Sequence, residues 1–210
     1  MTKTLRLLLA TATLATAALV GATGALACGN NSGYSYAGMG AATNAYGISA
    51  IITPLDAFDI LNGHVAGWVG VGGPGQGPNG TNEWLQIGYS GFPSITGSDI
   101  YYEVALPGRF PTYHQVSADV PSGTPAKMTV LEMHGRPNLW RVWLDHKPVS
   151  PPILLPQSDH GLTAIATTES WDGGTGACNT FLYSFGHVSI AHAPGGDWQQ
   201  SRTATRLEAR

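Results

Sequence analysis

The chain has 210 residues, of which 28 are glycine and 14 are proline, and only 11% are charged. A helical bundle or coiled coil needs a charge-rich surface, and about 25% charge is usual for soluble domains, so the composition disfavours those folds. The formal net charge of −3 leaves no basic surface for nucleic acid or an anionic membrane. Because 43% of the residues are hydrophobic, the chain can bury a core, and disorder is disfavoured. These numbers predict one glycine-rich, all-β domain.

Residues 1–27 have the pattern of a signal peptide. Lys3 and Arg6 supply positive charge, residues 7–20 are apolar, and Ala25-Leu26-Ala27 forms a small-residue cleavage motif. The apolar segment is too short to span a bilayer securely, and no later segment is long enough to try. We therefore expect cleavage after Ala27 and a secreted protein without a transmembrane segment.

Cys28 and Cys178 are the two cysteines of the sequence. Exported proteins meet an oxidising compartment, so a disulfide between Cys28 and Cys178 is one expectation. Cleavage after Ala27 also leaves Cys28 at the new N-terminus, where lipoproteins carry their acyl chains, so a lipid anchor at Cys28 is the alternative. The sequence does not decide between them.

Short runs of β-branched and aromatic residues alternate with glycine and proline in the rest of the chain, as is typical of strands and turns. Residues 28–45 are expected to form a polar tether and a first strand near Tyr34, residues 46–193 the β-sandwich domain, and residues 194–210 a polar C-terminal tail. Ten further strands are predicted at Ile48–Thr53, His64–Val71, Trp84–Tyr89, Ile100–Leu106, Tyr113–Val120, Ala126–Met133, Trp140–Asp145, Leu162–Ser170, Phe181–Phe185 and His187–Ala191. So many strands in one domain imply two packed antiparallel sheets or a closed barrel.

Carboxyl groups are scarce, and three glutamates lie inside apolar strand patterns: Glu103, Glu132 and Glu169. Because alternate residues of a strand share a face, Glu169 lies in line with Ile165 and Trp171. A carboxyl group on a half-buried strand face can act as a general acid or base. The plainer interpretation is a glutamate that accepts a hydrogen bond from a neighbouring backbone group or tyrosine.

Gln86 shares a strand face with Trp84, and its amide offers both a donor and an acceptor. Such a group can hold a water molecule and stabilise an oxyanion. The seven histidines show no metal-binding spacing, and the glycine-rich stretch 70–80 lacks the Gly-Lys-Ser/Thr of a phosphate-binding loop.

The order of motifs resembles the glutamic peptidases, the eqolisin family of acid endopeptidases. That family carries Trp-Val-Gly-hydrophobic-Asp-Gly, Leu-Gln-Thr-Gly, Trp-Tyr-Glu-Trp-Tyr-Pro and a later strand Ala-Glu-aromatic-Ile-aliphatic-Glu. The corresponding segments here are Trp68-Val69-Gly70-Val71-Gly72-Gly73, Leu85-Gln86-Ile87-Gly88, Tyr101-Tyr102-Glu103-Val104 and Ala164-Ile165-Ala166-Thr167-Thr168-Glu169. The chain departs from the pattern at Gly72, where the family has Asp, and at Val104-Ala105, where it has the second Trp-Tyr.

The resemblance implies a concanavalin-like β-sandwich, or jelly roll, of two bent antiparallel sheets. It implies Gln86 and Glu169 as the catalytic pair, with Trp68 along the cleft and Glu103 supporting its floor. Trp84 and Tyr102 are expected to contact the substrate as well. The expected enzyme is a monomeric, secreted endopeptidase that cleaves polypeptides at acid pH without metal or organic cofactor.

Two other classes fit the same architecture. One is a carbohydrate-binding or glycosidase jelly roll, in which Glu103 and Glu169 would supply the two carboxyl groups. The other is a catalytically silent exported sandwich, which the departures at Gly72 and Val104 favour.

Overall fold

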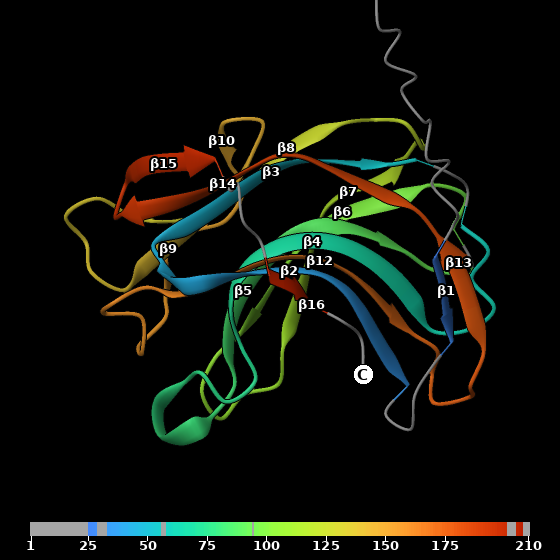
Figure 1. The fold of residues 1–210 in the computed structure, drawn as a ribbon, viewed down its shortest axis with the longest axis horizontal. Coiled ribbons are helices and arrows are strands. Elements are labelled where there is room, and N and C mark those ends of the chain that lie inside the picture. Colours follow the sequence, from blue (N-terminus) through green and yellow to red (C-terminus); the bar gives the residue numbers. More distant parts are fainter. Residues whose placement is uncertain (1–24, 29–32, 56–57, 94, 201–204, 208–210) are drawn as a thin grey trace, which may run out of the picture.

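The computed structural model describes residues 25–28, 33–55, 58–93, 95–200 and 205–207. Two antiparallel seven-stranded sheets pack face to face (Figure 1), and a separate two-stranded sheet pairs β1 (Ala25–Cys28) with β13 (Cys178–Phe181). In the described part of the chain the one helical element is a short 3-10 turn, η1 (Pro78–Gly80). The predicted β-sandwich of two antiparallel sheets is confirmed.

One sheet, called the pocket sheet below, has the strand order β16-β2-β12-β4-β5-β6-β7. Figure 1 shows it bent into an arch whose hollow side faces away from the other sheet. Its strands are β16 (Thr205–Leu207), β2 (Tyr34–Ala45), β12 (Leu162–Trp171), β4 (His64–Gly73), β5 (Glu83–Gly91), β6 (Ser98–Ala105) and β7 (Thr112–Val120).

The other sheet, called the second sheet, has the order β10-β9-β8-β3-β14-β15, and β11 also pairs with β9. Its strands are β10 (Lys147–Pro148), β9 (Leu139–Leu144), β8 (Ala126–Glu132), β3 (Gly47–Pro54), β14 (Tyr183–Ala193), β15 (Gly196–Gln200) and β11 (Ile153–Leu154).

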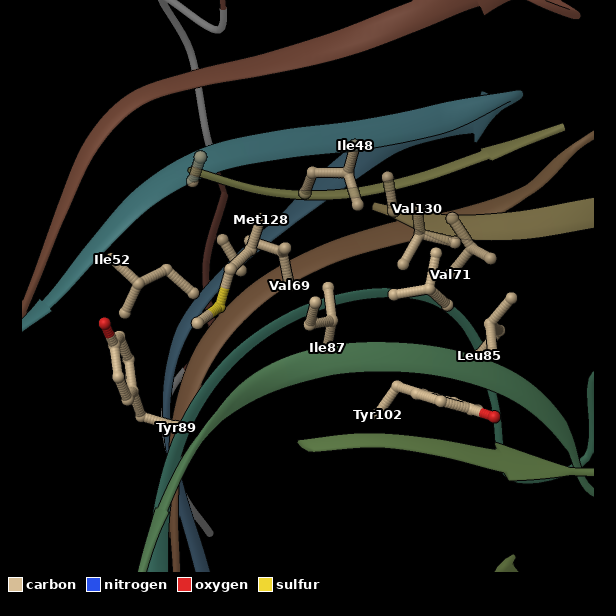
Figure 2. Packing of buried hydrophobic residues seen from close by; sticks show 14 of the residues in the cluster. Ile48, Ile52, Val69, Val71, Leu85, Ile87, Tyr89, Tyr102, Met128 and Val130 are labelled. Carbon is tan, nitrogen blue, oxygen red and sulfur yellow. The ribbon is translucent and has the colours of Figure 1, made fainter. Parts of the chain in front are cut away.

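The hydrophobic core fills the space between the two sheets (Figure 2). Alternate residues of each strand point to opposite faces, so every second residue of β3, β4, β5 and β8 enters this layer. Side chains with no exposed surface include Ile52, Val69, Leu85, Ile87, Met128 and Val130. The same alternation sends the intervening residues of β4, β5, β6 and β12 to the hollow side of the pocket sheet, where polar and aromatic side chains gather.

The C-terminal segment differs from its prediction as an unpatterned tail. Pairing of β15 with β14 and of β16 with β2 adds residues 196–200 and 205–207 to the edges of the two sheets. Edge pairing uses backbone groups and buries few side chains, so a polar sequence without an apolar pattern can still form it. Residues 201–204 and 208–210 lie outside the described part.

The predicted signal peptide, residues 1–27, lies outside the described residues except for the start of β1. The register of β1 on β13 sets the backbone of Cys28 directly opposite Cys178, which is disulfide-bonded. This register favours the disulfide over the lipid anchor. Within the described residues there is no helix long and apolar enough to cross a membrane.

Candidate functional site

A pocket of about 670 Å³ opens on the hollow side of the pocket sheet. It is built from β2, β4, β5, β6 and β12, with one residue from the segment after β4 and one from the segment before β7. Its lining consists of Tyr34, Tyr36, His64, Trp68, Gly70, Val71, Gly72, Gly73, Pro74, Trp84, Gln86, Glu103, Pro111, Ile165, Thr167 and Glu169. The structure therefore brings five of the six predicted active-site residues into one pocket.

Tyr102 is the exception, and its prediction as a substrate contact is corrected. It faces the core between the sheets, where it is buried, and its ring stacks on His114 with centroids 4.4 Å apart. The neighbouring Tyr101 points to the pocket side instead, because successive residues of β6 face opposite ways. Tyr101 accepts a hydrogen bond from Gln86 Nε2 at 3.0 Å.

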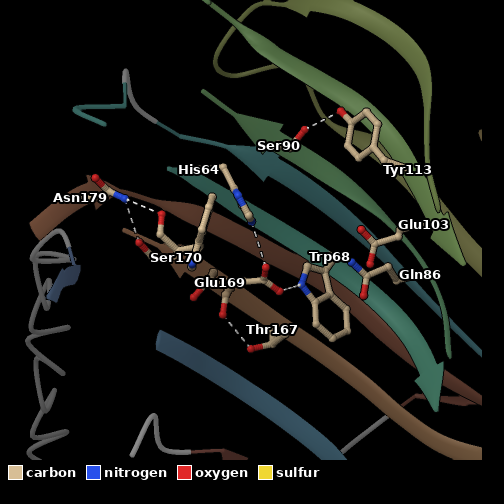
Figure 3. A network of polar contacts seen from close by, with 12 residues as sticks. His64, Trp68, Gln86, Ser90, Glu103, Tyr113, Thr167, Glu169, Ser170 and Asn179 are labelled. Atoms are coloured by element: carbon tan, nitrogen blue, oxygen red, sulfur yellow. Dashed lines mark hydrogen bonds and ion pairs between the residues drawn. The ribbon is translucent and has the colours of Figure 1, made fainter. Parts of the chain in front are cut away.

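Glu169 is held by two donors, which Figure 3 shows on either side of its carboxyl group. Trp68 Nε1 donates to Oε2 at 3.1 Å, and His64 Nε2 lies 3.1 Å from Oε1. The Glu169 side chain is 13% exposed and His64 is 24% exposed. Both carboxylate oxygens are thus engaged in fixing the positions of an indole and an imidazole on the pocket wall.

Glu103 has a different environment. Trp84 Nε1 donates a hydrogen bond to its Oε1 at 3.0 Å. Burial raises the pKa of Glu103, the Trp84 hydrogen bond lowers it, the negative charge of Glu169 raises it, and His64 lowers it. The net effect is a raised pKa, which suits a carboxyl group that exchanges a proton under acid conditions.

The strand register decides which residues are neighbours on the pocket floor. Gln86 lies directly opposite Glu103 on β6 and opposite Gly70 on β4. Gly70 in turn lies opposite Ile165 on β12, so the β12 residue level with Gln86 is Ile165. Glu169 comes four residues later, about 13 Å further along the strand. In Figure 3 the Trp68 side chain stands between Glu169 and Gln86.

The Gly72 departure has a structural cause. Gly72 has a φ of +86°, and a Cβ built on it would lie 2.2 Å from the backbone oxygen of Glu83 on β5. A side chain at this position would require the two strands to shift apart. An aspartate therefore does not fit the present backbone.

Sequence reasoning missed His64 and the tyrosines of the pocket. His64 begins β4 and shares a face with Ala66 and Trp68, so the period-two pattern contained the signal. Its ring contacts Trp171 (centroids 5.6 Å apart) and Phe92 (6.0 Å). Tyr34 and Tyr36 lie on β2, which β12 separates from β4, and their rings are stacked on each other. Among the described residues no group of three or more His, Cys, Asp and Glu side chains is arranged to hold a metal ion.

Comparison with known proteins gives fold-level similarity. No protein-family model matches the chain. No curated protein sequence matches it either. Among solved structures, scytalido-glutamic peptidase with a peptide-based transition-state analogue is similar with a TM-score of 0.50 and 15% identity, over 88% of this chain and 98% of that one.

Two further structures are similar at lower scores. SCP-B, a member of the eqolisin family in complex with the tripeptide Ala-Ile-His, has a TM-score of 0.43 and 17% identity over 85% of this chain and 97% of that one. The carbohydrate-binding module CBM66 from Bacillus subtilis has a TM-score of 0.40 and 10% identity over 79% and 90%. At these identities the likeness concerns the sandwich fold alone.

Proposed function

We propose that this chain is a secreted acid endopeptidase whose pocket activates water with one glutamine and one glutamate. The observation that carries the proposal is the cross-strand pair Gln86–Glu103 on the pocket floor. Side chains directly opposite each other on antiparallel strands have Cβ atoms about 4.5–5.5 Å apart. An amide and a carboxyl group at that spacing can share one water molecule. The sequence motifs around both residues and the sandwich fold support the same class of enzyme.

We assign the general base to Glu103 rather than to Glu169. Glu169 is the residue that the motif order predicts, but it lies four residues beyond the row of Gln86, and both its oxygens have partners. In the described part of the chain Trp84 is the one hydrogen-bond donor to the Glu103 carboxyl group. Glu169 then acts as a positioning residue for His64 and Trp68, which line the substrate path.

The reaction needs only groups on the pocket floor. The Glu103 carboxylate takes a proton from the bound water while the water oxygen attacks the carbonyl carbon of the peptide bond. One amide hydrogen of Gln86 is bonded to Tyr101, and the second, which has no acceptor among the described residues, can donate to the developing oxyanion. Protonated Glu103 then gives its proton to the leaving nitrogen as the carbon–nitrogen bond breaks, which returns the carboxylate.

The pocket walls suit an extended polypeptide with apolar side chains. Tyr34 and Tyr36 lie on one side, with ring centroids 6.0 Å apart, and Trp68 and Trp84 on the other strands present indole surfaces. Burial raises the pKa of Tyr34, and Glu169 and Glu103 raise it further, so its hydroxyl stays a neutral donor. Aromatic surfaces of this kind bind apolar side chains and backbone alike.

The test is cleavage of an acid-unfolded protein substrate by the exported protein, from about pH 3 to about pH 7, beside Gln86→Ala. We expect cleavage confined to acid pH and at least about a hundredfold lower in Gln86→Ala, since an oxyanion donor contributes about that factor. Both proteins are compared by circular dichroism so that a loss of fold is recognised. Intact substrate at every pH would contradict the proposal.

A glycoside-binding or glycoside-cleaving pocket is the second candidate. The observation that favours it is that Glu103 and Glu169 share one pocket and that the charge of Glu169 acts on Glu103. A glycosidase needs two such carboxyl groups, one on each side of the scissile bond. Release of reducing sugar from a polysaccharide, with no peptide cleavage, would establish this candidate.

The third candidate is a catalytically silent sandwich. It is favoured by the register, which sets Ile165 rather than a carboxyl group of β12 at the level of Gln86. This candidate predicts neither peptide cleavage nor sugar release.

A further inference from the structure

A second, separate groove of about 690 Å³ lies on the solvent face of the second sheet. In Figure 1 this sheet is the upper layer, and the pocket sheet lies on its other side. The groove crosses β9, β8, β3, β14 and β15, so it shares no residue with the pocket described above. Nothing in the proposed peptidase mechanism uses it.

The floor of the groove is a row of hydroxyl groups. Ser189 on β14 lies opposite Ser49 on β3, and Ser49 lies opposite Thr129 on β8. Ser49 Oγ and Thr129 Oγ1 are 2.8 Å apart, and Ser189 Oγ donates to the backbone oxygen of His187 at 3.2 Å. Each hydroxyl has both a donor and two acceptor sites, so each retains hydrogen-bonding capacity toward a ligand.

Tryptophan side chains on the two outer strands of the groove, β9 and β15, line it on either side of these hydroxyl groups; Trp198 is in register with Ala191, two residues from Ser189. Trp143 on β9 is the register partner of Thr129 and is half-buried. Trp198 on β15 is 41% exposed and lines the same groove. Four strand spacings separate β9 from β15, which is about 19 Å. Each indole offers a flat apolar surface on which a ligand ring can stack.

Apart from two histidines, the groove lining contains one residue with a formal charge, Lys127, and Asp145 lies next to it outside the lining. Lys127 is exposed on β8, and its backbone N–H donates to the exposed Asp145 at 2.9 Å. His146 and His187 also line the groove, in backbone conformations with φ of 65° and 53°. The arrangement offers hydrogen-bond donors and stacking surfaces without a strong field of one sign.

We propose that this groove is a binding site for a neutral polysaccharide chain. The apolar faces of pyranose rings would stack on Trp143 and Trp198, while sugar hydroxyls between them would bond to Thr129, Ser189 and the Lys127 ammonium group. An extended ligand fits the site because the two indoles are far apart and the hydroxyl groups of β8, β3 and β14 lie between the strands that carry them. The site would hold the protein on a glycan surface while the opposite face remains open.

Affinity electrophoresis of the exported protein through gels containing a soluble β-1,4-glucan, a β-1,3-glucan, xylan or, as an acidic comparison, alginate tests the proposal. Retardation by at least one neutral polysaccharide is expected. Trp198→Ala should weaken that binding by about tenfold or more, because tryptophan is among the residue types that contribute most to binding energy. Thr129→Val, which keeps the shape but removes a hydroxyl, should weaken it by a smaller factor, and thermal unfolding checks that both variants fold.

Trp84→Phe in the pocket is the matched control and should leave the retardation unchanged. No retardation in any neutral gel would overturn the proposal, as would retardation that Trp84→Phe abolishes and Trp198→Ala does not. Retardation by alginate alone would also overturn it, because charge would then be the cause. Peptide cleavage is measured on the same samples and should be unchanged in Trp198→Ala, so failure of this site and failure of the peptidase proposal are separate results.

Discussion

Gln86 on β5 and Glu103 on β6 are cross-strand neighbours, and both side chains enter the pocket on the hollow side of the sheet. Each is fixed by one aromatic partner, Tyr101 for the glutamine and Trp84 for the glutamate. The pair is placed by backbone hydrogen bonds of two central strands rather than by a loop, so its geometry is preorganised.

Trp84→Phe should raise the pKa of Glu103 further. Burial already raises that pKa, and the Trp84 hydrogen bond opposes the effect. Phenylalanine keeps the ring and removes the donor, so the carboxylate loses stabilisation. A general base must be ionised, and we therefore expect the acid limb of the kcat/KM profile to move to higher pH. Carboxyl ¹³C NMR of Glu103 measures the same shift directly, and an unmoved titration would refute the assigned hydrogen bond.

Glu169→Gln should move the same limb in the opposite direction. After burial, the negative charge of Glu169 is a second cause that raises the pKa of Glu103. Removing the charge lowers the pKa, so activity should persist to lower pH than in the parent protein. If both variants moved the limb the same way, the electrostatic account of the pocket would be wrong.

Stability should fall as the pH rises from acid toward neutral. Burial raises the pKa of Glu83 and of Glu132 above the ordinary value of 4.5, and one backbone hydrogen bond lowers each in part. A raised pKa means that the folded state binds more protons than the unfolded state, so the contribution is complete below pH 4.5 and is lost as the pH rises through the folded-state pKa.

Thermal unfolding between about pH 4 and about pH 7 measures this loss. Glu83→Gln keeps the acceptor for the Gln157 N–H and removes the ionisation, so the decline in Tm should be smaller in this variant. Asp119→Asn changes an exposed side chain on β7 and serves as control. An equal decline in all three proteins would show that Glu83 is not responsible.

Gly72→Ala should destabilise the fold more than Gly80→Ala. Both glycines have positive φ, +86° and +75°, but a Cβ on Gly72 meets the Glu83 backbone oxygen whereas one on Gly80 meets nothing within 4 Å. The conformational cost alone is about 1–3 kcal/mol, and Gly72→Ala adds the steric conflict. The free energy of unfolding from urea titration compares them. Equal losses would mean that the contact with Glu83 relaxes at no cost.

The sequence predicts strands well where apolar and polar residues alternate, as in β4, β5 and β12. Alternation also explains why Trp68, Gln86 and Glu169 reach one face. It says nothing about which residues of distant strands lie level with one another, because register depends on pairing across the sheet. Ile165 rather than Glu169 therefore lies at the level of Gln86, and only the register reveals it.

The choice of Tyr102 rather than Tyr101 shows the limit of reading a motif without the two-residue period of a strand. In Tyr101-Tyr102-Glu103 the motif alone suggests that both tyrosines serve the site, whereas a strand sends neighbours to opposite faces. Counting back from Glu103 by two selects Tyr101, so the sequence is sufficient to predict the correct residue.

The edge strands β15 and β16 could not be predicted from the sequence, because backbone pairing leaves little trace in a polar segment.

The most direct test of the account is kcat/KM at acid pH for the parent protein, Glu103→Gln and Glu169→Gln. The account predicts loss of at least about a hundredfold in Glu103→Gln, as for removal of a general base, and a retained activity with a shifted pH profile in Glu169→Gln. Full activity in Glu103→Gln, with loss in Glu169→Gln, would contradict the central claim and return the catalytic role to Glu169.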